Sequence, residues 1–239
     1  MISQTTISRV IMLWYMRFDI SVAMMSGFGS TLPREWLIAV VEHCDAQRAN
    51  YPSDLELKIE YYACSLRLIS LDMTNIYERG RRGELTGESF AEEYARTTER
   101  LFEWRNSIEP AVTDPSYLVT DFGHRQPSEG DVFNPYKAGL LYRMPLFGMT
   151  IMRTEWNSVF IMHMSQDPTA PQKDLSERMR GYAMEICEIF ATVEAWPEAP
   201  PGVLLPFQQA IGIAALYLPQ EGGFPMWIRR KFAAIEKLG

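Results

Sequence analysis

Apolar residues recur at helical spacing along most of the chain, and the segments they define carry helix start and stop signals. The clearest example opens with Ser53-Asp54-Leu55-Glu56, a capping-box pattern, and its apolar residues return every three or four positions until Gly80. No segment shows the strict alternation that is typical of a half-buried strand. Further helices are predicted at about 4–26, 31–49, 87–108, 137–166 with an interruption at Pro145, 173–196, 203–217 and 225–238.

This pattern predicts an all-α fold of about eight helices. A chain of 239 residues can build one large hydrophobic core without needing a second, so we expect a single compact domain over residues 1–239. The longest irregular stretch covers about 109–135 and contains four prolines. A loop of that length in a compact domain is usually functional or mobile.

The first predicted helix is apolar nearly all round. One stripe spans an arc of about 80°, and the opposite side is apolar as well. Such a helix is typical of a central, buried position. The stripe consists of Ile7, Ile11, Trp14, Phe18, Val22 and Met25, and the opposite side carries Met12, Met16, Ile20 and Ala23.

Two charges, Arg17 and Asp19, interrupt this helix in "LWYMRFDISVAMMSG", residues 13–27. A membrane-spanning helix needs about 20 residues nearly free of charge, so we expect no membrane association. The two charges lie about 160° apart on the helix and cannot pair with each other. Each therefore needs a partner elsewhere, either on another helix or, for one of them, in a cavity. We predict that Asp19 faces the cavity.

A second helix, within 149–164, offers a wall for such a cavity. Its apolar face includes polar Arg153 and His163, which a dry core would not need, and Arg153 is a candidate partner for Asp19. The alternative interpretation is an ordinary packed core. The candidate catalytic residues are Asp19, Arg153, His163 and Arg17, and the candidate ligand contacts are Trp14, Tyr15, Phe18, Met149, Trp156 and Phe160.

Composition narrows the classes of function. The net charge is -7 and the basic residues are scattered, so direct nucleic-acid binding is not expected. Three widely spaced cysteines are typical of reduced intracellular thiols. The residues of "EHCD", 42–45, are all of types that can bind a metal ion. On a helix they point in different directions, so they cannot converge on one ion. No G-x-S-x-G, H-E-x-x-H, P-loop or paired C-x-x-C motif is present, and neither a metal nor a cofactor is predicted.

Three stretches resemble the helical regulatory, or middle homology, domain of fungal zinc-cluster transcription factors. The resemblance implies an all-helical domain, nuclear or cytoplasmic, that senses ligands or restrains activation. The six-cysteine zinc module of that family is absent from these 239 residues. The stretches are "LWYMRFDISVAMMSGFGSTLPREW", "NPYKAGLLYRMPLFGMTIMRTEWNSVFIMHM" and "PMWIRRKFAAIEKLG".

Two hypotheses of different classes remain beside the plainer interpretation of a pure interaction scaffold. The first is a binding module, stand-alone or excised from a longer factor, which takes a small apolar metabolite and has a possible protein partner or second copy. The second is an enzyme of secondary metabolism that cyclises or isomerises a polyketide or terpenoid in a pocket lined by methionine and aromatic residues. Such a reaction needs a correctly positioned substrate and one or two polar groups that stabilise developing charge, so the absence of a standard motif does not exclude it.

Overall fold

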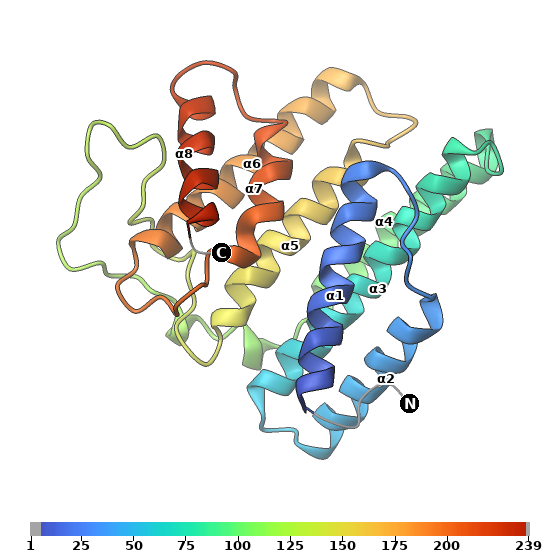
Figure 1. Cartoon of the computed structure of the whole chain (residues 1–239), viewed down its shortest axis with the longest axis horizontal. Coiled ribbons are helices and arrows are strands. Elements are labelled where there is room, and N and C mark those ends of the chain that lie inside the picture. Colours follow the sequence, from blue (N-terminus) through green and yellow to red (C-terminus); the bar gives the residue numbers. More distant parts are fainter. Residues whose placement is uncertain (1–5, 238–239) are drawn as a thin grey trace. The chain divides into compact units, whose positions relative to one another are not determined.

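The computed structural model describes residues 6–237, with the side chains of 11–171 and 173–237. Its regular elements in this part of the chain are eight α-helices and three short 3₁₀ helices, without a strand, which confirms the all-α prediction (Figure 1). The described chain divides into two compact units, 6–113 with 166–168 and 114–165 with 169–237. The prediction of one domain over 1–239 stays a prediction.

The first unit is built around one long helix. Its elements are α1 (Thr6–Ser26), α2 (Arg34–Asn50), α3 (Leu55–Arg81), α4 (Gly87–Asn106) and η1 (Pro110–Val112). The helices α1, α2 and α4 all pack on α3 (Figure 1). The Asp54 carboxylate caps α3 by accepting the Leu57 amide hydrogen at 3.1 Å. The cap therefore lies one residue after Ser53, the N-cap of the predicted capping box.

The core face of α3 is the one that its periodicity indicates. Tyr62, Leu66 and Met73 on this face are almost inaccessible to solvent. Trp104 of α4 packs edge-on against Tyr62, with ring centroids 6.4 Å apart, and its indole nitrogen donates to the Tyr62 carbonyl at 3.1 Å. A buried indole with a satisfied N–H fixes how α4 lies on α3.

The second unit contains η2 (Pro115–Tyr117), α5 (Phe147–Met164), α6 (Gln172–Ala195), η3 (Leu205–Phe207), α7 (Gln208–Ala215) and α8 (Phe224–Glu236). The helix α6 packs on both α5 and α7, and α8 packs on α7. Phe190 of α6 lies edge-on to the rings of Phe207 and Trp227, each 5.9 Å away. These three buried rings form the aromatic centre of the unit.

The structure corrects two expectations about the elements. Residues 137–143 are not helical: the amide of Arg143 donates to the Tyr117 carbonyl at 2.8 Å, and the amide of Val119 donates to the Leu141 carbonyl at the same distance. A single antiparallel bridge, Leu118 to Tyr142, accompanies these bonds. Residues 138–140 form a turn, and 141–143 are extended because pairing with the preceding loop satisfies their backbone groups.

The helix α1 is not buried all round. Its contact with α3 leaves Met16, Ile20 and Ala23 buried, and these belong to the side opposite the predicted stripe. The stripe residues from Ile11 to Met25 are exposed instead, and the side chain of Ile7 lies outside the described part. None of the helices within 6–237 is long and apolar enough to cross a membrane.

Candidate functional site

The predicted ligand contacts on α5 lie in the core of the second unit. Met149, Trp156 and Phe160 are buried, and the rings of the last two are stacked with centroids 4.7 Å apart. Tyr182 of α6 packs edge-on against both rings, at 5.8 and 5.3 Å. A ligand on this face of α5 would have to displace Tyr182, so the arrangement is the one that the packed-core interpretation describes.

The two polar candidates on α5, Arg153 and His163, do not share a site. The Arg153 guanidinium donates to the Glu185 carboxylate at 2.5 Å and to the Gly139 carbonyl at 3.4 Å. His163 is completely buried and lies beside the ring of Phe160. The ten positions between Arg153 and His163 correspond to about 15 Å along the helix, too far for both to act on one reacting group.

Asp19 is an anchor for the chain that follows α1. Its carboxylate accepts hydrogen bonds from the Ser30 hydroxyl, from the Thr31 hydroxyl at 2.5 Å and from the Thr31 amide at 3.3 Å. The N-cap of α2 is Pro33, so Thr31 does not cap this helix. Asp19 and Arg153 each have partners within their own unit, and the predicted Asp19–Arg153 pair stays a prediction.

The other candidate residues of α1 lie at or near the surface of the first unit. Arg17 is half-buried, and Ser21 donates its hydroxyl to the Arg17 carbonyl at 2.6 Å. Trp14, Tyr15 and Phe18 are exposed, and the rings of Trp14 and Phe18 are stacked with centroids 5.7 Å apart. A face of this kind suits contact with another molecule better than enclosure of a small one.

Replacing Asp19 with alanine should destabilise the first unit by about 1 kcal/mol, because three donors lose their acceptor at a partly solvated position. Asp19→Asn keeps one acceptor oxygen and should lose less. Urea unfolding followed by circular dichroism measures both variants. An unchanged unfolding midpoint for Asp19→Ala would show that the carboxylate does not serve as an anchor.

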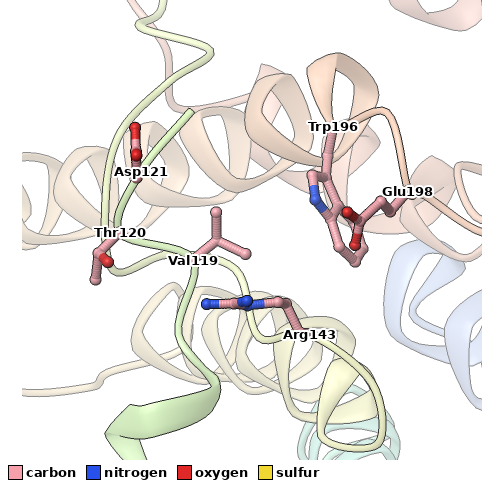
Figure 2. Close-up of a pocket in the computed structure, with 6 residues that line it drawn as sticks. All are labelled: Val119, Thr120, Asp121, Arg143, Trp196 and Glu198. Atoms are coloured by element: carbon pink, nitrogen blue, oxygen red, sulfur yellow. The ribbon is translucent and has the colours of Figure 1, made fainter. Parts of the chain in front are cut away.

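A hollow in the second unit brings together residues that the sequence does not group (Figure 2). Its volume is about 330 Å³. Two segments supply one side, the loop after η2 and the chain just before α5, and the chain after α6 supplies the other. The lining residues are Val119, Thr120, Asp121, Arg143, Trp196 and Glu198.

Backbone pairing sets the first side of the hollow. The bonds that join 117–119 to 139–143 place Arg143 next to Val119, and Figure 2 shows the guanidinium extending beneath the valine. Asp121 accepts the amide hydrogen of Gly123 at 2.8 Å, an Asx-type turn that orients its carboxylate. The loop can therefore present Thr120 and Asp121 without a regular element around them.

The second side is held by an aromatic stack. Trp196 follows the last residue of α6 and is buried, and its ring stacks on Phe147 of α5 with centroids 5.8 Å apart and planes 19° apart. Glu198, two residues later, is exposed beside it. The stack fixes the indole, so the hollow has one rigid apolar wall.

The charges of the hollow are one guanidinium and two carboxylates. Within the described residues, the Arg143 side chain makes no hydrogen bond or ion pair with the protein, whereas Arg153 in the same unit is paired. A cation left open between carboxylates can receive an anionic group from a ligand, and the carboxylates can accept hydrogen bonds from the same ligand.

One feature of the sequence indicated part of this hollow. The irregular stretch 109–135, predicted to be functional or mobile, contributes Val119, Thr120 and Asp121. Arg143, Trp196 and Glu198 belong to no recognised sequence motif, and only the fold brings them near this loop. Among the described residues no group of three His, Cys, Asp or Glu side chains is placed to hold a metal ion. No protein-family model, curated protein or solved structure matches the chain.

Proposed function

We propose that this chain is a metabolite-binding module and that its ligand is a small zwitterionic molecule with an apolar part, of the size of an aromatic amino acid. The observation that carries this proposal is the guanidinium of Arg143, which has no partner among the described residues and lies in a hollow with two carboxylates. An arginine in this setting is suited to a carboxylate, which it can bind through two parallel hydrogen bonds.

The remaining groups define the rest of the ligand. Asp121 and Glu198 accept hydrogen bonds from an ammonium or hydroxyl group, and Trp196 with Val119 covers an apolar part. A volume of about 330 Å³ lies at the small end of the range for ligand sites. This ligand is more polar than the metabolite that the sequence suggested, since half of the lining side chains are charged.

The proposal keeps the binding role that the resemblance to the fungal regulatory domain implies, and it does not include catalysis. The enzyme hypothesis needs a pocket lined by methionine and aromatic side chains with polar groups on its wall. On α5 these side chains pack against Tyr182, and Arg153 is paired with Glu185. Arg153 and the rings of this face are thus engaged within the protein, and the proposal therefore rests on binding alone.

Three related compounds test the proposed ligand chemistry. L-Phenylalanine has both charges, 3-phenylpropionate lacks the ammonium group and phenethylamine lacks the carboxylate. We expect only phenylalanine to raise the melting temperature at millimolar concentration, because selective binding to the native state stabilises it. Isothermal titration then gives the dissociation constant for each compound.

Arg143→Gln should weaken phenylalanine binding at least tenfold, the loss expected for one charged hydrogen-bond pair. The matched control is Arg230→Gln on α8, an exposed arginine of the same unit that does not line the hollow. Equal affinities for the two variants, or a melting temperature that none of the three compounds moves, would contradict the proposal.

A further inference from the structure

The helix α1 has an exposed apolar face whose members recur at a regular spacing. We call these five residues the α1 stripe. Between Ile11 and Met25 they are separated by three, four, four and three positions, so all lie on one side of the helix. Their exposed fractions are 61% for Ile11, 66% for Trp14, 55% for Phe18, 43% for Val22 and 54% for Met25.

The α1 stripe is held outward by the packing of the first unit. Met16, Ile20 and Ala23 on the other side of α1 are buried, and α1 packs on α3. The ring planes of Trp14 and Phe18 lie 6° apart, so the two largest members already form one continuous surface. A rigid apolar surface loses little side-chain entropy when a partner covers it.

The area of the α1 stripe reaches the lower limit of what a specific dimer needs. A large side chain presents on the order of 200 Å² when fully exposed, so five side chains exposed by roughly half offer about 500 Å². Two copies in contact would bury about 1,000 Å² from the stripes alone, which reaches the size of a specific interface. Patches of this size are at the upper end of what monomers leave exposed.

The spacing favours a second copy of this chain as the partner. The spacing of the α1 stripe is the same on both sides of Phe18. When two α1 helices cross antiparallel at this residue, each stripe residue therefore lies opposite a stripe residue of the second copy. Ile11 then lies at the level of the second copy's Met25, and Trp14 at the level of its Val22. A two-fold interface requires this self-complementarity, which a surface for an unrelated partner does not need.

The two charges near the middle of α1 do not oppose this contact. Arg17 and Asp19 lie outside the α1 stripe, on its two edges. Asp19 already accepts hydrogen bonds from Ser30 and Thr31. Pairing through the stripe therefore leaves no unpaired charge in the centre of the interface, where its desolvation would be costly.

We propose that two copies of this chain associate through α1, antiparallel, with a two-fold axis at Phe18. The first test is the mass in solution, measured by light scattering and sedimentation velocity over micromolar concentrations. We expect twice the chain mass for the wild type. Phe18→Glu sets two like charges together at the axis and should raise the dissociation constant at least about a hundredfold.

The matched control is Met226→Glu, which places the same charge at an exposed apolar residue of α8 outside the α1 stripe and should leave the dimer intact. Circular dichroism checks that both variants keep their helices. A wild type that stays monomeric, with the stripe covered instead by another protein or a lipid surface, would overturn the proposal. So would equal effects of the two substitutions.

A cysteine at the axis tests the symmetry directly. Two-fold pairing at Phe18 brings the same position of both copies together, so Phe18→Cys should give a disulfide-linked dimer under mild oxidation, whereas Met226→Cys should not. The native cysteines Cys44, Cys64 and Cys187 are buried and should not compete. Cross-linking of Met226→Cys but not of Phe18→Cys would place the contact elsewhere and reject the proposed axis.

Discussion

Replacing Phe190 with alanine should lower the free energy of unfolding of the second unit by about 3–5 kcal/mol. The ring is completely buried on α6 and lies edge-on to Phe207 and Trp227, each 5.9 Å away. Truncation removes both aromatic contacts and leaves a cavity between α6, η3 and α8 that surrounding side chains fill only in part. Most small domains have only 5–15 kcal/mol of stability, so this loss is a large share.

Urea unfolding measures the Phe190→Ala loss, with tryptophan fluorescence as a probe because Trp227 touches the ring. The control is Leu216→Ala at the end of α7, an exposed apolar residue of the same unit. Its effect should stay within about 0.5 kcal/mol. A Phe190→Ala protein that loses no more than this control would show that the aromatic centre does not hold the second unit together.

The sequence predicted helices well where one face alone is apolar. On α3 the apolar positions choose a single side, and Asp54 marks its start with a side-chain cap. The face predicted from the spacing is the one that packs. Local preference and packing agree in this segment, so periodicity is sufficient to place it.

The helix α1 shows where periodicity fails. Both of its sides are apolar, so the pattern does not say which side packs. The predicted stripe, with Trp14 and Phe18, is exposed, and the side with Met16 and Ile20 is buried on α3. The shape of the neighbouring helix determines which of the two apolar faces is buried, and this shape cannot be inferred from the spacing along one helix.

Residues 137–143 were misread for a different reason. The pattern there contains Leu140 and Leu141, which suit a helix as well as an extended segment. Pro145 disfavours helical backbone at the residue before it, and bonds to 117–119 satisfy the extended backbone. The same pairing sets Arg143 beside Val119, so the candidate site depends on a long-range contact that local propensity does not encode.

Replacing Asp72 with asparagine should cost the first unit about 2 kcal/mol at neutral pH. Asp72 of α3 accepts hydrogen bonds from Arg34 at 2.5 and 3.0 Å and from Arg100 at 2.9 Å, so it joins the start of α2 and the side of α4 to α3. Removing one member of a fully buried pair costs about 3–5 kcal/mol. We expect less because both arginines are partly exposed.

The matched control is Asp45→Asn. Asp45 is exposed and pairs with Arg48 three positions later on α2, at 2.7 Å. An exposed pair within one helix contributes about 0.5 kcal/mol or less. Similar losses for Asp72→Asn and Asp45→Asn would mean that Asp72 does not join the three helices.

The Asp72 effect should also depend on pH in a definite direction. Burial raises the pKa of the Asp72 carboxyl, but the hydrogen bonds and charges of Arg34 and Arg100 outweigh it, so the pKa lies below its usual value near 3.8. A group whose pKa falls on folding stabilises the protein fully above its unfolded pKa and loses that contribution as the pH drops through the folded pKa. The advantage of the wild type over Asp72→Asn should therefore be constant from neutral pH down to about 5 and shrink below about 4. Urea titrations of both proteins across this range measure it, and an advantage that grew on acidification would show that the arginines do not stabilise the charged form of Asp72.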